Sequence, residues 1–255
     1  MMMNFTLSNQ VQIPAVGIGT FMMTPDQAEQ AVVDALACGY RMIDTAQAYM
    51  NERAVGRGIK RSGVAREDIF ISTKIWASQY LTEGTVEKSL ELLGTDYIDL
   101  MFIHQPAGDF MAGYRKLETV AIRPMVNQIE MHPYFAQESA LKVMEEYQIV
   151  PEAWAPLGGG RHNPFDNEMV KEIAAGHGKT VGQVVLRWNV QRGVVVIPKS
   201  VHKARIEENF QIWDFTLTEE EMQKISSLDL GYQGTAVKHF DPEFVKMCNI
   251  RKIHE

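Results

Sequence analysis

Short apolar runs and amphipathic segments follow one another along most of the chain. The clearest amphipathic segment lies at 24–39, where Thr24 and Gln27 form a capping box, Pro25 stands in the first turn and Gly39 follows the last turn. Its apolar residues recur every three or four positions, as on one buried helix face: Ala28, Ala31, Val32, Ala35 and Leu36. This pattern predicts a helix that packs against a core.

The apolar runs are rich in Val, Ile, Leu and Phe, which predicts strands buried on both faces. We expect seven of them, at 16–20, 40–46, 68–75, 97–104, 124–130, 149–158 and 193–200. Further helices are expected at 50–62, 84–93, 136–148, 167–176 and 181–191. Two more capping boxes, Thr180 with Gln183 and Thr218 with Glu221, predict helix starts.

Strands that alternate with helices predict a parallel sheet covered on its outside, and TIM-type (β/α)8 barrels of roughly 250 residues fold as one domain. We therefore expect residues 1–255 to form a single α/β barrel domain. An open doubly wound sheet is the alternative, but it usually carries a glycine-rich fingerprint after its first strand. Here Gly17 and Gly19 have no third glycine, which favours the barrel.

Composition narrows the function classes. The chain is 45% hydrophobic and 22% charged, with a net charge of -7, which argues against a nucleic-acid or anionic-membrane surface. It contains no apolar run long enough to cross a membrane and no signal-peptide pattern at its start, so we expect a cytoplasmic protein. Cys38 and Cys248 are far apart and the seven histidines are scattered, so neither a disulfide framework nor a metal site is expected.

Polar side chains stand at or near the ends of the apolar runs: Asp44, Lys74, His104, Gln128 and Lys199. A barrel gathers the carboxyl ends of its strands on one face, where its chemistry is normally located. Asp44, Lys74 and His104, together with Tyr49, would form a proton-donating centre there. A nearby ammonium stabilises a phenolate and so lowers the pKa of a tyrosine from about 10, which makes it a better acid.

Seven motifs cover nearly the whole chain and resemble those of the aldo-keto reductases: VGIGT, IDTAQAYMNE, ISTKIW, MFIHQP, VNQIEMHPY, EAWAPLG and IPKSVHKARIEEN. The bacterial branch of 2,5-diketo-D-gluconate reductases is most similar. This resemblance implies a barrel that uses NADP(H) to reduce small aldehydes or ketones to alcohols. It implies that Tyr49 is the general acid, Lys74 its pKa-lowering partner, Asp44 the support for Lys74, and His104 the residue that orients the substrate.

The same resemblance assigns the cofactor contacts to Gly19, Thr20, Gln128, Trp154, Leu157, Lys199, Ser200, Arg205, Glu208 and Asn209. Among these, Lys199, Ser200 and Arg205 would bind the adenosine 2'-phosphate, which favours NADPH over NADH. It places Phe21, Trp76 and Gln105 at the substrate, and it implies that the tail, with Phe240 and Phe244, folds over the barrel mouth.

The chain departs from this family between its HQP and VNQIE motifs. Relatives carry about 30 more residues there, one βα unit with the fifth strand, and the joint lies near Glu118 and Thr119. Three explanations are open: the natural protein contains a segment absent from this sequence, the gene encodes a shortened protein, or a neighbouring chain covers the gap. The first is favoured because the other functional positions are intact.

Two further functions stay open. A catalytically weak NADP(H)-binding sensor or interaction module would keep the cofactor site, and the missing unit favours it, whereas the intact proton-donating residues oppose it. A barrel enzyme acting on sugar phosphates would not bind NADPH. The expected partner is a small-molecule carbonyl substrate, and the expected state is a monomer or weak homo-oligomer.

Overall fold

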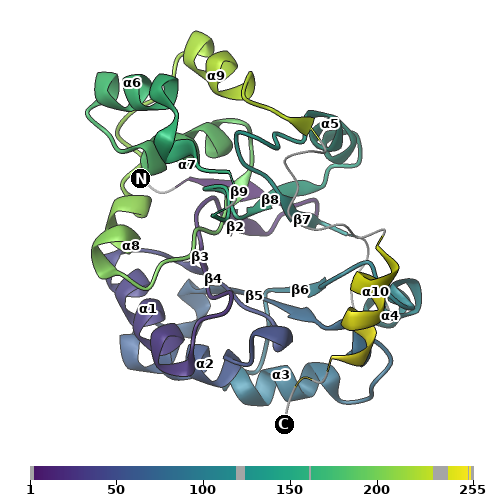
Figure 1. Cartoon of the computed structure of the whole chain (residues 1–255). Helices are drawn as coiled ribbons and strands as arrows, with labels where there is room; N and C mark the ends of the chain where they lie inside the picture. Colours follow the sequence, from purple (N-terminus) through teal and green to yellow (C-terminus); the bar gives the residue numbers. More distant parts are fainter. Residues whose placement is uncertain (1–2, 119–123, 161, 232–240, 252, 254–255) are drawn as a thin grey trace. The chain divides into compact units, whose positions relative to one another are not determined.

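A computed structural model describes residues 3–118, 124–160, 162–231, 241–251 and 253 (Figure 1). The chain divides into two compact units, each of which is described by itself. The first unit holds Met1–Gly17 and Pro124–Ala236, and the second unit holds Ile18–Arg123 and Val237–Glu255. That residues 1–255 form a single domain stays a prediction.

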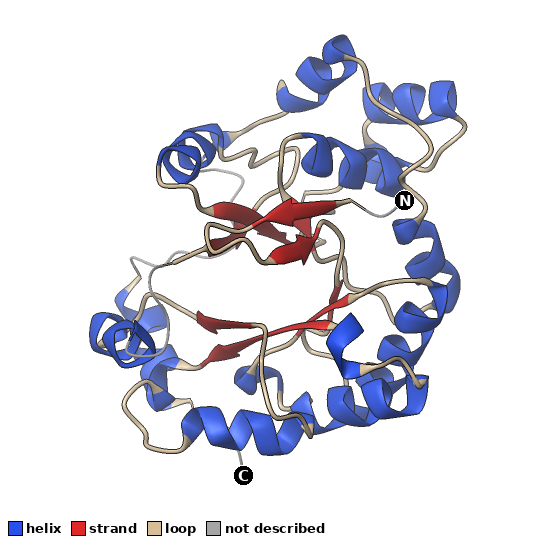
Figure 2. Ribbon diagram, turned by 180° about the vertical axis from the view of Figure 1, so that it is seen from behind, coloured by secondary structure: helices blue, strands red, loops and turns tan. Residues whose placement is uncertain are grey.

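The second unit is built on a four-stranded parallel sheet with the order β3-β4-β5-β6. Its strands are β3 (Ile18–Gly19), β4 (Met42–Asp44), β5 (Phe70–Ile75) and β6 (Leu100–Ile103). Its helices are α1 (Pro25–Cys38), α2 (Glu52–Ser62), α3 (Thr85–Leu93), α4 (Phe110–Glu118) and α10 (Pro242–Ile250), with the short 3-10 helices η1 (Gln47–Tyr49), η2 (Arg66–Asp68) and η3 (Ala77–Gln79). Helices α1, α2 and α3 lie along one face of this sheet (Figures 1 and 2).

The first unit contains a three-stranded parallel sheet with the order β7-β8-β9 and an antiparallel hairpin, β1-β2. Its strands are β1 (Asn4–Thr6), β2 (Gln12–Pro14), β7 (Val126–Glu130), β8 (Val150–Trp154) and β9 (Val195–Val196). Its helices are α5 (Glu138–Glu146), α6 (Glu168–His177), α7 (Val181–Gln191), α8 (Lys203–Phe210), α9 (Glu219–Ser226) and the 3-10 helix η4 (Pro164–Asp166). The sequence pattern did not predict the hairpin.

The helix starts confirm the capping predictions. Thr24 accepts a hydrogen bond from the backbone of Gln27, whose side chain accepts one in return, and Gly39 ends α1 in the left-handed conformation with φ 111°. The predicted apolar stripe of this helix is buried. The boxes at Thr180 and Thr218 form in the same way at the starts of α7 and α9. Local side-chain chemistry therefore sets these three helix starts.

Seven parallel strands are present in the part of the chain that the structure describes, as predicted. Between β6 and β7, the described residues hold a single helix, α4, which ends at Glu118. The predicted joint therefore falls where α4 ends, and Thr119 lies outside the described residues. Among those residues, β6 pairs only with β5, and β7 pairs only with β8.

The C-terminal helix α10 packs onto the second unit next to η3. Its Cys248 is fully buried in a core cluster with Trp76 and Tyr80, and Phe244 is partly buried against the same cluster. Phe244 therefore docks against the second unit, whereas Phe240 lies outside the described residues and the folding of the tail over the barrel mouth stays a prediction. No helix in the described residues is long and apolar enough to span a membrane.

Candidate active site

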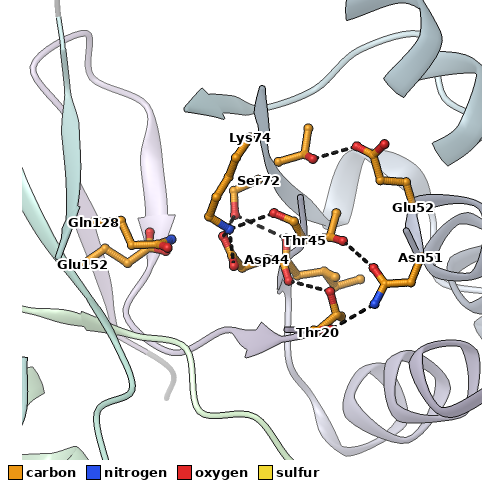
Figure 3. A network of polar contacts seen from close by, with 11 residues as sticks. Thr20, Asp44, Thr45, Asn51, Glu52, Ser72, Lys74, Gln128 and Glu152 are labelled. Carbon is orange, nitrogen blue, oxygen red and sulfur yellow. Dashed lines mark hydrogen bonds and ion pairs between the residues drawn. The ribbon is translucent and has the colours of Figure 1, made fainter. Parts of the chain in front are cut away.

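A buried ion pair between Lys74 and Asp44 lies at the ends of two neighbouring strands of the second unit (Figure 3). The ammonium donates to Oδ1 and Oδ2 of Asp44 at 2.7 Å and 2.6 Å, and to the backbone oxygen of Thr45 at 2.7 Å. The Ser72 hydroxyl donates to Asp44 Oδ1 at 2.8 Å. The pair forms because β4 and β5 run parallel in register, Asp44 beside Ser72, so their carboxyl ends meet.

Tyr49 and His104 lie beside this pair. Tyr49 ends the 3-10 helix η1, and the Lys74 ammonium is 5.1 Å from the centre of its ring. His104 follows β6, and its ring centre is 5.5 Å from that of Tyr49, edge to face. The structure therefore brings together the four residues that the sequence predicted as a proton-donating centre.

His104 is held in a neutral form. Burial, followed by the positive charges of Lys74 and Arg251, lowers the pKa of His104 well below 6.5. Its Nδ1 is buried and has no hydrogen-bond partner among the described residues. A neutral imidazole carries one N-H donor and one acceptor nitrogen, so it can donate a hydrogen bond without carrying charge.

This gives a prediction for pH dependence. Below about 6.5 the unfolded chain binds more protons at His104 than the folded chain, so the free energy of unfolding should decrease as the pH falls. The ring protons of His104, followed by NMR from about pH 8 to about pH 5.5, should shift little, and His104→Gln should flatten the dependence of stability on pH in this range. A His104 that titrates near 6.5 would contradict the assignment.

Gly19 and Thr20 lie at the end of β3, against Asp44. Gly19 pairs with Asp44 in register, and both the backbone N-H and the hydroxyl of Thr20 donate to the Asp44 carbonyl oxygen, at 2.9 Å and 3.0 Å. The buried side chain of Asn51 donates to the carbonyl oxygens of Thr20 and Met23 and accepts from Thr45 (Figure 3). Asn51 thus fixes the 20–23 turn to the start of α2.

The 20–23 turn carries Phe21, which is 59% exposed. Its ring packs edge to face on Tyr49, with 5.2 Å between the two ring centres. Trp76 is buried and lies 5.0 Å from His104 between ring centres, again edge to face. The backbone N-H and carbonyl oxygen of Gln105 both hydrogen-bond to the Tyr80 hydroxyl. Two of the three predicted substrate residues therefore contact the proton-donating centre.

A second buried carboxyl, Glu52, was not predicted. It accepts hydrogen bonds from Thr73 at 2.7 Å and from Ser89 at 3.4 Å, and burial raises its pKa. Gln47 donates to Ser89 and accepts from the backbone N-H of Trp76. These contacts tie η1 and the start of α2 to β5 and α3, and so hold Tyr49 and Trp76 in place. Glu52 was missed because it is a charged residue at the start of a helix, and such residues are usually exposed.

In the first unit, a cavity of about 600 Å³ lies over the starts of α7 and α8. It is lined by six of the predicted cofactor residues: Leu157, Lys199, Ser200, Arg205, Glu208 and Asn209. Neither Lys199 nor Arg205 forms an ion pair with a carboxylate among the described residues, and both line this cavity. Unpaired cations, a hydroxyl and a helix start favour an anion.

Four further residues line the cavity that sequence reasoning missed: Phe165, Gly182, Val201 and His202. His202 is the N-cap residue of α8 and donates its backbone N-H to Ser200 Oγ at 3.1 Å. Thr180 and Gln183, the capping box of α7, both donate to Glu208 on α8 and so hold the two helices together. Gly182 lies between these two residues, so the predicted capping box could have indicated its place beside Glu208.

Gln128 and Trp154 lie on neighbouring strands of the first unit. Gln128 pairs in register with Glu152 and donates to its carboxylate at 2.5 Å (Figure 3). Glu152 is fully buried, and Trp154, two residues further along β8, is half-buried. The structure does not place these two residues among those lining the cavity. Among the described residues, no three His, Cys, Asp or Glu side chains gather so as to hold a metal ion.

Comparison with known proteins identifies the family. A family model described as "Aldo/keto reductase family" matches residues 15–120 and 111–230. The chain belongs to the aldo/keto reductase family. Curated relatives of this aldo/keto reductase include a 9,11-endoperoxide prostaglandin H2 reductase of Trypanosoma cruzi, 42% identical over 88% of this chain and 90% of the relative. A glyoxal reductase of Bacillus subtilis is 41% identical over 88% of this chain and 91% of the relative.

Solved structures agree. An aldo-keto reductase from a Medee basin deep-sea metagenome library has a TM-score of 0.89 at 37% identity, covering 93% of this aldo/keto reductase and 98% of that chain. A Bombyx mori aldo-keto reductase in complex with NADP has a TM-score of 0.86 at 29% identity, and the match covers 96% of this chain and 97% of that chain. These neighbours confirm the predicted fold class, the TIM-type (β/α)8 barrel.

The alignments also bear on the missing unit. The alignment with the T. cruzi relative spans 257 positions, but 88% of this 255-residue aldo/keto reductase is only about 224 residues. About 33 positions therefore have no counterpart in this chain, and the B. subtilis alignment of 254 positions leaves about 30. The two segments matched by the family model overlap at 111–120, so the family pattern is interrupted there. The alignments support the absence of about one βα unit from this sequence, and the overlap of the two matched segments places the interruption near the predicted joint.

As a member of this family, the protein is an oxidoreductase that acts on carbonyl groups. Enzymes of the family use a nicotinamide cofactor. The predicted bacterial branch of 2,5-diketo-D-gluconate reductases stays a prediction, and so do the roles of the individual site residues.

Proposed function

We propose that the protein reduces small aldehydes or ketones to alcohols with NADPH. When bound, NADPH supplies a hydride, and with it two electrons, to the carbonyl carbon and becomes NADP+. The carbonyl oxygen takes one proton, so each turnover converts a carbonyl compound, NADPH and H+ into an alcohol and NADP+. The observation that supports this reaction best is the cluster of Tyr49, His104 and the buried Lys74–Asp44 pair. Loss of NADPH absorbance with glyoxal and methylglyoxal tests it.

In this proposal Tyr49 donates the proton from its hydroxyl. The Lys74 ammonium, 5.1 Å from the ring, stabilises the negative charge that develops on the phenol oxygen, and Asp44 holds that ammonium in place. Neutral His104 orients the carbonyl oxygen through a hydrogen bond that its imidazole donates. The proton on Tyr49 is then restored from solvent.

The cavity of the first unit supports NADP(H) as the cofactor. Its cations, Lys199 and Arg205, together with the Ser200 hydroxyl and the start of α8, suit the 2'-phosphate, and Leu157 and Phe165 offer apolar contacts to the adenine. Glu208 and Asn209 would hydrogen-bond to the base. Gln128 and Trp154 are proposed for the nicotinamide, and Gly19 and Thr20 for its approach to Asp44. Gly19 pairs with Asp44 in register, and Thr20 donates to the Asp44 carbonyl oxygen.

Arg205→Ala should reduce NADPH affinity and leave NADH affinity nearly unchanged, because only NADPH carries the 2'-phosphate. One charge-assisted contact contributes about 1.5 to 3 kcal/mol, so the dissociation constant for NADPH should rise roughly ten- to one-hundredfold. Quenching of protein fluorescence by each cofactor measures both constants.

Lys203→Ala is the matched control, because Lys203 begins the same helix but does not line the cavity. It should change neither constant by more than about twofold, since exposed charges contribute little. Equal loss of NADPH and NADH affinity in Arg205→Ala would show that the residue does not recognise the phosphate.

The second candidate function is a catalytically weak NADP(H)-binding sensor or interaction module. The interruption of the family pattern at 111–120, with about 30 positions absent, favours it. NADPH binding without turnover of any carbonyl compound in a broad set would support the sensor, whereas turnover that depends on Tyr49 would exclude it. A barrel acting on sugar phosphates would bind no NADPH.

Several expectations stay predictions: the cytoplasmic location, the monomeric or weakly associated state, and the lack of nucleic-acid partners. Phe21, Trp76 and Gln105 are proposed as substrate contacts, and the first two already touch Tyr49 and His104. A single cooperative unfolding transition, seen by calorimetry, would support the single-domain prediction for residues 1–255.

A further inference from the structure

Two exposed methionines, Met22 and Met50, each follow an aromatic residue of the candidate active site. Met22 comes directly after Phe21 and Met50 directly after Tyr49, and the rings of Phe21 and Tyr49 pack edge to face with 5.2 Å between their centres. Asn51, the residue after Met50, donates to two backbone carbonyl oxygens of the turn that carries Met22, at 2.9 Å and 3.2 Å (Figure 3). Both methionines are therefore held on neighbouring segments beside Tyr49.

Neither burial nor backbone preference explains a methionine at these two positions. Met22 is 62% exposed and Met50 is 49% exposed, so they do not fill the core as the fully buried Met42 and Met131 do. Both have a left-handed backbone, with φ of 55° and 59°, a conformation that glycine and asparagine adopt more readily than a residue with a long side chain. What methionine adds at such a position is an exposed, polarisable thioether.

A thioether reacts with hydroperoxides. The sulfur gives an electron pair to the outer oxygen of the peroxide, so that an S–O bond forms while the O–O bond breaks. The proton of the attacked oxygen passes to the oxygen that leaves, which departs as an alcohol, or as water when the oxidant is hydrogen peroxide. Sulfur loses two electrons and the peroxide gains them. The product, methionine sulfoxide, is polar, and thiol-dependent reductases convert it back to methionine.

We propose that Met22 and Met50 are sites of reversible oxidation by hydroperoxides, and that their sulfoxides weaken the binding of apolar carbonyl substrates beside Tyr49. A sulfoxide oxygen is a hydrogen-bond acceptor, and an apolar substrate that covers it removes water without offering a donor in exchange. A small polar substrate imposes less of this cost. The effect on substrate binding rests on the proposed carbonyl reduction, whereas the oxidation of the two side chains does not.

The first measurement follows the oxidation itself. The protein is treated with hydrogen peroxide, and peptide mass spectrometry gives the fraction of each methionine that has gained one oxygen. Met22 and Met50 should be oxidised before the buried Met42 and Met131, because the peroxide must reach the sulfur. If Met22 or Met50 stayed reduced while Met111, which is 49% exposed on α4, was oxidised, the proposal would be overturned.

The second measurement compares an apolar aldehyde, hexanal, with a polar one, glyoxal. Peroxide should lower the ratio of kcat/KM for hexanal to kcat/KM for glyoxal roughly three- to tenfold, mainly through the KM of hexanal. General damage, such as oxidation of Cys38 or Cys248, would lower both values, so the ratio isolates the polarity of the two side chains. Methionine sulfoxide reductases with a dithiol should restore it. A ratio that stayed unchanged with both methionines oxidised would contradict the proposal.

The double variant Met22→Leu, Met50→Leu removes both thioethers and keeps apolar side chains of similar volume. Its ratio should not respond to peroxide. Met111→Leu is the matched control, because Met111 is as exposed as Met50 but is not next in sequence to a residue of the site. Its ratio should fall after peroxide as in the wild type. An equal fall in the wild type and the double variant would show that another lesion is responsible.

A binding measurement separates this inference from the proposed function. 1-Hexanol, the alcohol that corresponds to hexanal, is titrated calorimetrically into the protein with NADP+, before and after peroxide. An affinity that falls in the wild type but not in Met22→Leu, Met50→Leu supports the inference even for a protein that turns over no carbonyl compound. Hexanol that does not bind to the wild type, or whose affinity responds to peroxide equally in both proteins, refutes it whatever the activity.

Discussion

Tyr49→Phe should lower kcat for carbonyl reduction by about a hundredfold to ten-thousandfold, the range that a positioned general acid contributes. The change removes one oxygen and the proton that the reaction needs. The ring itself should stay in place, because it packs on Phe21 and His104 through its carbon edges and faces. Consumption of NADPH at saturating substrate measures kcat directly.

NADPH binding is the control for this variant, because the predicted phosphate contacts belong to the first unit and Tyr49 to the second. The dissociation constant for NADPH should therefore change little. Unchanged turnover in Tyr49→Phe would show that another group supplies the proton, and it would remove the main support for the proposed reaction.

The helices were the part of the fold that the sequence predicted best, and the reason is local. Each of Thr24 and Gln27 accepts a hydrogen bond from the other's backbone N-H, so the start of α1 can be predicted without tertiary contacts.

The lengths of the strands were harder to predict than the helix starts. The apolar run 193–200 is largely buried, yet only Val195–Val196 forms ladder hydrogen bonds, because apolar residues report burial rather than pairing.

The hairpin β1-β2 was not predicted, because it lacks the apolar pattern on which the strand predictions rest. Its first strand, Asn4–Thr6, is mainly exposed, so it has no apolar periodicity. It is formed by pairing with Gln12–Pro14 across a turn in which Leu7 and Val11 hydrogen-bond through their backbones. Such pairing depends on backbone geometry that side-chain patterns do not record.

Some residues of the candidate site could be predicted from the sequence and others could not. Asp44 and Lys74 could be predicted to meet because neighbouring parallel strands end together, and they do so in register. Arg251 could not be predicted, since it contacts Ala48 across 203 positions of the chain. Glu52 could not be predicted either, because only the tertiary structure supplies the hydroxyls of Thr73 and Ser89 that allow a carboxyl group to be buried.

Lys74→Met should lower the free energy of unfolding by about 3 to 5 kcal/mol, in addition to abolishing most of the turnover. Lys74 and Asp44 are both about 2% exposed in their side chains, and the Lys74 ammonium donates to both oxygens of the Asp44 carboxylate. Without Lys74, the buried carboxylate keeps its hydrogen bond from Ser72 but loses the cation that donates to both of its oxygens. Urea unfolding followed by circular dichroism measures the loss, which is a large part of the stability of an ordinary domain.

The double variant Asp44→Asn, Lys74→Met shows whether the stability lost in Lys74→Met comes from the unpaired Asp44 charge or from the lost packing of the lysine stem. Asparagine can still accept from Ser72, and no unpaired charge remains, so most of the stability lost in Lys74→Met should return. Turnover should stay low, because Tyr49 has then lost the ammonium that stabilises its developing charge. Arg53→Met, which breaks an ion pair with Glu91 whose side chains are 59% and 57% exposed, should change the free energy of unfolding by no more than about 1 kcal/mol. If the double variant were as unstable as Lys74→Met, packing of the lysine stem rather than charge pairing would account for the effect.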